Sequence, residues 1–177
     1  CRCWPARDIQ VVAPRIPHCQ EFDRRQPYSI VRVAYPDVPK LRMPALWSLL
    51  GIRALQLIVK QRPQVLHLQH VFENGPWGLL CKRTLGIPYW VHTYGEELTL
   101  ARRHPWLKQL VRRVLAEAAG ISTISHYTLD LLEHFGVSRD RCLLVHPGVE
   151  WQRFQERPPL HLKLPAGRRL LTLGRLM

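Results

Sequence analysis

Two adjacent carboxylates, Glu96 and Glu97, stand in the segment PYWVHTYGEEL at residues 88–98. They follow an apolar run that ends in Tyr94 and Gly95, and a glycine at this point lets the backbone turn sharply. Carboxylates in such a place can accept hydrogen bonds from the hydroxyl groups of a polar ligand, or take part in acid–base chemistry. They can also be solvated, or favour the start of a following helix through its dipole. The segment by itself leaves both interpretations open.

Other polar residues stand where predicted strands end. His70 and Ser125 each close an apolar run and are therefore candidates to line a cleft, although Ser125 equally suits the cap of the helix after it. Gly75 either gives a ligand close access to the backbone or, beside Pro76, simply opens a helix. His67 lies inside a predicted strand and points away from the face of His70, so we expect a satisfied core histidine there.

These residues depend on an alternation of short apolar runs and helical patterns. Strands are predicted at residues 8–14, 28–36, 64–70, 88–94, 120–125 and 141–147, helices at 44–61, 105–118 and 127–135, and a loop with a short helix at 75–85. Continuous apolar strands that alternate with helices favour a parallel sheet covered on both faces. The sequence therefore predicts an α/β fold with a Rossmann-like, doubly wound parallel sheet. Ligands bind such sheets outside the carboxyl ends of the strands, where residues 94–97 fall.

The character of the chain changes after about residue 155. We predict one domain over residues 1–155, a polar and proline-rich linker over 156–167, and the first strand of a second domain over 168–177. The five cysteines are odd in number and form no C-x-x-C pair, which favours free thiols in a reducing cytoplasm.

The chain of 177 residues carries 26 Lys and Arg against 13 Asp and Glu, a formal net charge of +13. This excess predicts an anionic partner: nucleic acid, a phosphate-bearing ligand or an anionic membrane. The positive charge is scattered and accompanies no zinc spacing, basic arm or RNP-like strand pair, so we do not expect nucleic acid. The absence of G-x-G-x-x-G argues against a dinucleotide-binding dehydrogenase.

One helical segment, residues 102–115, separates its charges from its apolar residues. At about 100° per residue, the cationic side holds Arg102, Lys108, Arg112 and Arg113. The other side holds Trp106, Leu107, Leu110, Val111, Val114 and Leu115. We expect the apolar side to pack on the sheet. The cationic side is then solvated or, alternatively, docks on anionic lipid headgroups.

The order of several segments resembles the N-terminal half of family 4 glycosyltransferases, sugar-nucleotide-dependent enzymes of GT-B fold. The segments are PQVLHLQH, LGIPYWVHTYGEEL, AAGISTISHYTLDLL, FGVSRDRCLLVHPGVEWQRF and LLTLGRL. The resemblance spans residues 8–177. It implies that residues 1–155 form the acceptor-side domain and that 168–177 begin the donor-binding domain. The family's first strand and glycine-rich loop should precede Asp8, so the resemblance implies an internal fragment that is inactive alone.

The resemblance also implies roles for the residues above. The catalytic, acceptor-side cleft would hold Tyr94, Gly95 and Glu97. Substrate would be bound by His70, Gly75 and Ser125. The donor diphosphate would be bound by Gly174 and Arg175, since a guanidinium fork suits two phosphates. The family commonly has His-Gly where this chain has Tyr94 and Gly95, which argues against a histidine contact at that position. No metal and no cofactor is implied, and no D-x-D sequence occurs.

The function implied is a hexosyltransferase-type enzyme. It would transfer a sugar from a nucleotide-sugar donor to a glycan, lipid or small-molecule acceptor in cell-envelope or polysaccharide synthesis. The expected location is the cytoplasm, with peripheral attachment to the inner face of the membrane as an open question. The alternative is a basic anion-binding module, for nucleic acid or anionic lipid, without catalysis.

Overall fold

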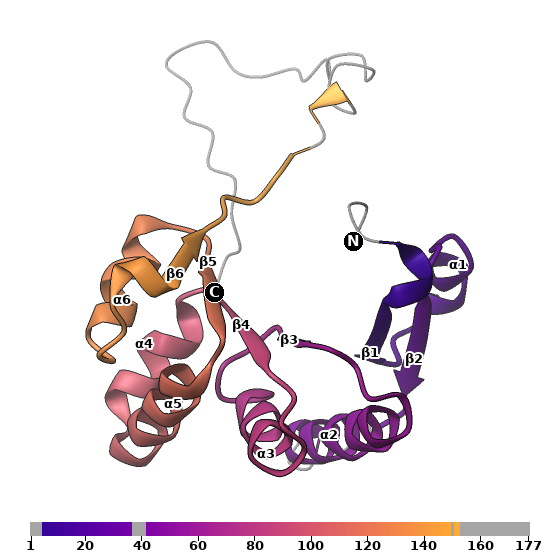
Figure 1. Cartoon of the computed structure of the whole chain (residues 1–177). Coiled ribbons are helices and arrows are strands. Elements are labelled where there is room, and N and C mark those ends of the chain that lie inside the picture. Colours follow the sequence, from indigo (N-terminus) through magenta and orange to yellow (C-terminus); the bar gives the residue numbers. More distant parts are fainter. Residues whose placement is uncertain (1–4, 37–41, 150, 153–177) are drawn as a thin grey trace. The chain divides into compact units, whose positions relative to one another are not determined.

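The computed structural model describes residues 5–36, 42–149 and 151–152 (Figure 1). Gly174 and Arg175, the predicted linker at 156–167 and the predicted strand at 168–177 lie outside these residues. Residues up to His146 form one compact unit, and the chain from Pro147 onward belongs to a second. The fold described below is that of the first unit.

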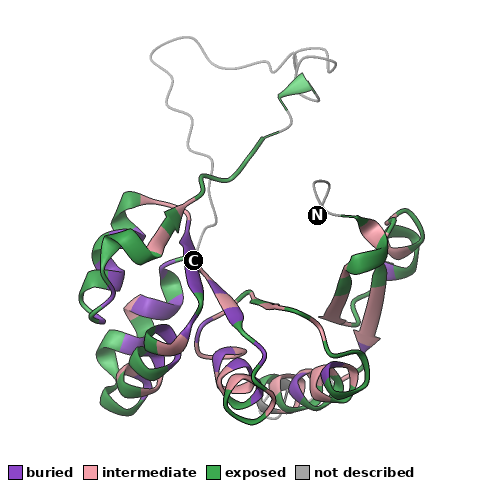
Figure 2. Ribbon diagram, in the orientation of Figure 1, coloured by how far each residue is buried: buried purple, intermediate pink, exposed green. Residues whose placement is uncertain are grey.

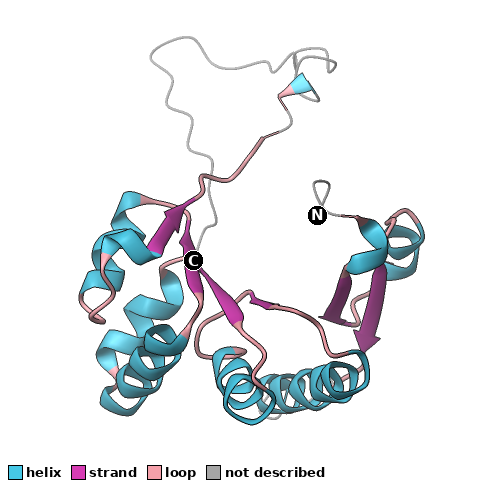
Figure 3. Cartoon of the chain, in the orientation of Figure 1, coloured by secondary structure: helices cyan, strands magenta, loops and turns pink. Residues whose placement is uncertain are grey.

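Strands and helices alternate along the chain (Figure 3). The strands are β1 (Gln10–Pro14), β2 (Ser29–Val33), β3 (Leu66–Leu68), β4 (Tyr89–Thr93), β5 (Gly120–Thr123) and β6 (Cys142–Leu144). The α-helices are α1 (Cys19–Arg24), α2 (Arg42–Gln61), α3 (Gly75–Leu85), α4 (Glu96–Arg103), α5 (Pro105–Glu117) and α6 (His126–Glu133), with 3-10 turns at Ala6–Asp8 and Arg139–Arg141. The predicted α/β class is confirmed; α1 and α4 were not foreseen.

All strand pairs are parallel, but the strands form two sheets. One consists of β1 and β2, and the other has the order β3-β4-β5-β6. The predicted parallel, Rossmann-like arrangement is thus confirmed, with the described strands divided between two sheets. They are divided because no described strand pairs with the outer edge of β1 or of β3, so nothing joins the two groups by hydrogen bonds.

The main core lies on one face of the four-stranded sheet, where purple residues gather in Figure 2. Alternation along β4 directs Tyr89 and Val91 to this face, and both are fully buried. Val111 and Val114 of α5 pack against them. The hydroxyl of Tyr89 donates to the backbone oxygen of Val114 at 2.7 Å, so the buried polar tip of this ring is satisfied. Burial raises the pKa of Tyr89 to about 12.

The helical segment at residues 102–115 is broken at His104, whose backbone is extended. Arg102 thus belongs to α4, whereas the other cations of the predicted face belong to α5. Pro105 opens α5, as proline does where its missing N–H costs nothing. Trp106 was predicted on the buried side, and this is wrong: the side chain is 70% exposed. Leu107 takes the inward position instead.

Two further observations concern the chain as a whole. No helix in the described ranges combines the length and the apolar character needed to cross a lipid bilayer. Cys19, Cys81 and Cys142 are free thiols, as predicted for them.

Candidate functional site

The carboxyl ends of β3, β4 and β5 bring three of the predicted site residues, His70, Tyr94 and Ser125, to one edge of the sheet. Thr93 of β4 pairs in register with Thr123 of β5, and both strands run the same way. Tyr94 therefore emerges beside the chain that leads to Ser125. His70 follows the end of β3, which pairs with β4 on its other side. The prediction that these residues share an edge is confirmed.

Tyr94 is the centre of a group of polar side chains at this edge. Its hydroxyl donates to Oε1 of Gln69 at 2.6 Å. Its ring lies against that of His70, with the ring centroids 5.5 Å apart. The Tyr94 side chain is 42% exposed, so these three side chains form a surface that a ligand can reach. We refer to Gln69, His70 and Tyr94 as the edge cluster.

Gln69 was missed by the sequence analysis. The signal was its position next to His70, at the end of the predicted strand, because residues that leave neighbouring parallel strands meet at one edge. Two further histidines were also missed. His126 and His146 follow β5 and β6, with ring centroids 6.3 Å apart, and Nδ1 of His146 lies 3.1 Å from the backbone oxygen of Ile124.

Glu97 lies in the first turn of α4 and is only 4% exposed. Its Oε1 accepts a hydrogen bond from the backbone N–H of Tyr94 at 2.8 Å. Gly95, between them, has φ 105°, a left-handed conformation that favours glycine. A Cβ at Gly95 would also lie 3.1 Å from Oγ1 of Thr128 in α6. In this arrangement Glu97 fixes the backbone that carries Tyr94, and Glu96 remains exposed.

Ser125 caps α6. Its Oγ accepts from the backbone N–H of Thr128 at 3.2 Å and lies 3.0 Å from the Thr128 hydroxyl. The helix-cap interpretation is thus confirmed. Because the side chain is only half-buried, its hydroxyl can still form a hydrogen bond to a ligand at this edge.

Gly75 occupies a different environment. It is buried at the start of α3, and a Cβ there would lie 2.6 Å from Cγ1 of Val114. The glycine thus allows α3 to approach α5 closely. The three atoms nearest to such a Cβ all belong to Val114, so this position faces the core and not the edge cluster.

Deeper in the sheet, a hydrogen-bonded chain crosses three neighbouring strands. Ser122 of β5 bonds to Nδ1 of His92, and Nε2 of His92 lies 3.3 Å from Nδ1 of His67 in β3. Burial, and secondly the charge of His67, lowers the pKa of His92. His67 is exposed, so the predicted core histidine is wrong.

No three Asp, Glu, His or Cys side chains within the described ranges gather closely enough to hold a metal ion. The polar atoms at the edge are instead hydroxyl, amide and imidazole groups. Such groups recognise neutral polar ligands by hydrogen bonds.

An α/β domain with exposed polar side chains at the carboxyl edge of a parallel sheet is the arrangement of a ligand-binding domain of the doubly wound type. A sequence model described as Glycosyltransferase Family 4 matches residues 1–153. This chain therefore belongs to glycosyltransferase family 4. A search of curated proteins found no match.

Proposed function

We propose that this chain forms the acceptor-binding side of an enzyme that transfers a sugar from a nucleotide-sugar donor to a glycan, lipid or small-molecule acceptor. Membership of glycosyltransferase family 4 supports a transferase. The observation that carries the proposal is the edge cluster, which presents hydroxyl, amide and imidazole groups to solvent at the carboxyl ends of β3 and β4. Synthesis of the cell envelope or of a polysaccharide is the setting that we propose.

The edge cluster suits an acceptor rich in hydroxyl groups. Tyr94 donates its own proton to Gln69, so its oxygen lone pairs remain able to accept a hydrogen bond from a sugar hydroxyl. The amide nitrogen of Gln69 retains two donors, and the half-buried Ser125 adds a hydroxyl at the next strand end. Glu97 acts by positioning, since its carboxylate holds the backbone of Tyr94.

For the donor, we propose that Gly174 and Arg175 contact the diphosphate. A guanidinium carries a permanent charge and a planar fork of donors that fits phosphate oxygens. The donor is a substrate, and the proposal requires no metal or other cofactor.

We also propose a cytoplasmic enzyme that contacts the inner face of the membrane through the region of residues 102–115. The support is the excess of positive charge together with the exposed tryptophan at position 106. The same charge supports the alternative function, a basic anion-binding module without catalysis. Catalytic turnover distinguishes the transferase from the anion-binding module, because only the transferase releases nucleoside diphosphate.

The test uses the full protein encoded by the gene that contains this sequence. It is incubated with a panel of sugar nucleotides and acceptors, and release of nucleoside diphosphate is followed. We expect turnover with at least one donor and acceptor. Tyr94→Phe, which removes the hydroxyl bonded to Gln69, should raise the acceptor KM about 5–10-fold, as expected for the loss of a hydrogen bond worth about 1 kcal/mol.

The matched control is Tyr28→Phe, which makes the same chemical change at a half-buried residue just before β2, outside the edge cluster. It should leave KM unchanged. Failure to release nucleoside diphosphate with every pair, together with retained binding to polyanions, would decide for the alternative function. A KM insensitive to Tyr94→Phe in an active enzyme would place the acceptor elsewhere.

A further inference from the structure

The outward face of α5 combines an aromatic side chain with cations. Leu107, Val111, Val114 and Leu115 point into the core and are buried. Trp106 and Arg113 are seven residues apart, about two helical turns, so both lie on the opposite, exposed face. Gln109 stands between them at helical spacing, three residues after Trp106 and four before Arg113. The structure thus places the tryptophan among the cations, whereas the sequence pattern assigned it to the other side.

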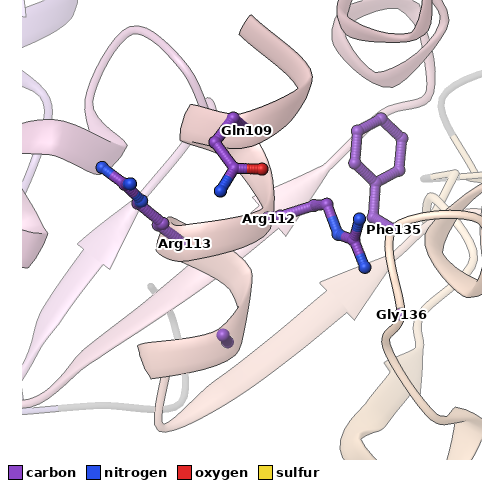
Figure 4. A pocket seen from close by; sticks show the side chains of 6 residues that line it. Gln109, Arg112, Arg113, Phe135 and Gly136 are labelled. Atoms are coloured by element: carbon purple, nitrogen blue, oxygen red, sulfur yellow. The ribbon is translucent and has the colours of Figure 1, made fainter. Parts of the chain in front are cut away.

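A shallow pocket of about 490 Å³, widely open to solvent, lies on this face. It is lined by Gln109, Arg112, Arg113 and Ala116 of α5 and by Phe135 and Gly136 after α6. Figure 4 shows the amide of Gln109 between the two arginine side chains, with Arg112 extending toward Phe135. A Cβ at Gly136 would lie 3.7 Å from Nη2 of Arg112, so the turn that contains this glycine borders the guanidinium closely.

Neither Arg112 nor Arg113 is paired with a carboxylate in the described part of the chain. The acidic side chains nearby are already engaged. Asp130 and Glu133 both pair with Arg139, at 2.5 Å and 2.6 Å. Glu117, at the end of α5, pairs with Arg83. Two guanidinium groups therefore face solvent around the pocket without a counter-charge from the protein.

We propose that this face of α5, formed by Trp106, Gln109, Arg112 and Arg113, binds the phosphate group of an anionic phospholipid at a membrane surface. The inference rests on the proposed membrane contact and names its ligand. The guanidinium forks bond the phosphate oxygens, and the Gln109 amide donates a further hydrogen bond. The indole of Trp106 enters the boundary between headgroups and acyl chains, where amphipathic rings are stable.

Trp106 is the reason that we favour a lipid over a soluble phosphate ester. The Trp106 indole, 70% exposed, does not line the pocket that the arginines border, but it gains apolar burial at a membrane interface. The face also belongs to the helical layer and not to the strand ends, which hold the proposed acceptor cluster. Occupation of one surface does not block the other.

The test is co-sedimentation of the 177-residue chain with vesicles of phosphatidylcholine alone or mixed with phosphatidylglycerol, at about 0.15 M salt. We expect binding only to the mixed vesicles. The double variant Arg112→Gln/Arg113→Gln should weaken it about 30-fold, since each cation near an anionic surface contributes close to a fivefold gain. Trp106→Ala should weaken it about 10-fold.

The control is Arg15→Gln/Arg24→Gln, which removes the same charge from exposed arginines of the β1–α1 region. It should change binding less than threefold. Equal binding to neutral vesicles, or an equal loss in the control, would overturn the proposal. Glycerol 3-phosphate and inorganic phosphate are then added at equal concentration. If only glycerol 3-phosphate displaces the protein from the vesicles, the site binds a soluble phosphate ester instead. Sugar transfer is measured separately, so a negative vesicle result leaves the proposed enzyme activity intact.

Discussion

Replacing Glu97 tests whether the buried carboxylate positions the edge cluster. The carboxylate accepts a hydrogen bond from the N–H of Tyr94 at 2.8 Å and is nearly inaccessible to water. Glu97→Ala leaves that N–H without a partner, which costs about 2 kcal/mol, and loses about 0.5 kcal/mol of favourable interaction with the N-terminus of α4. Glu97→Gln keeps an acceptor oxygen in place and should cost about 1 kcal/mol.

The free energy of unfolding is measured by urea denaturation followed by circular dichroism at neutral pH. The control is Glu96→Ala, because Glu96 is exposed and its side chain makes no hydrogen bond within the described residues. We expect a loss below about 0.5 kcal/mol there. The reasoning is refuted if Ala and Gln at position 97 destabilise equally, or if the Glu96 variant matches Glu97→Ala.

Two further predictions concern packing and pH. Gly75→Ala should destabilise the fold by about 1–3 kcal/mol in the same urea experiment, because its Cβ would overlap Val114. The control Gly148→Ala should be neutral, because a Cβ there would have no atom within 4 Å. Equal effects of the two substitutions would contradict the packing of Gly75 against Val114. The pKa of His92 is lowered in the fold, so the unfolded chain binds a proton more readily. Stability from this group is full above about pH 6.5, the unfolded value, and is lost as pH falls below it and through the lowered pKa of the folded state. His92→Gln should reduce this acid loss, and an unchanged pH profile from pH 8 to about 5 would count against it.

Much of the fold could be predicted from the sequence, because apolar runs and helix ends are local signals. The strand at residues 88–94 corresponds to β4, and residues 75–85, predicted as a loop and a short helix, are helical throughout as α3. The short helix α4 was missed, since EELTLARR has only two buried leucine or alanine positions to mark an inward side. The separation of the two sheets was also missed. Strand pairing is non-local, and no pattern within a strand says which edge stays unpaired.

The sequence predicted at which edge of the sheet the candidate residues lie, but not which of their side chains are in contact. From the predicted strand ends we expected Tyr94, His70 and Ser125 at the carboxyl edge of the sheet, and the structure has them there. The strand ends gave no information on which side chains touch, because these contacts depend on rotamers and on register. The bond from Tyr94 to Gln69 is an example. The orientation of Trp106 was assigned wrongly for a different reason: about two helical turns separate it from Arg113 within α5, so it shares the exposed side of that arginine.

The paired carboxylates at positions 96 and 97 have different physical roles, which explains why a chain so rich in positive charge keeps both. Successive residues of a helix point about 100° apart, so one carboxylate turns inward while its neighbour meets water. A buried carboxylate is costly unless hydrogen-bonded, and the backbone N–H of Tyr94 provides that bond. Gly95, with its left-handed backbone, lets the chain turn from β4 into α4, so that the Glu97 carboxylate can reach this N–H. The exposed side chain of Tyr94 is thus positioned by a carboxylate that is itself buried.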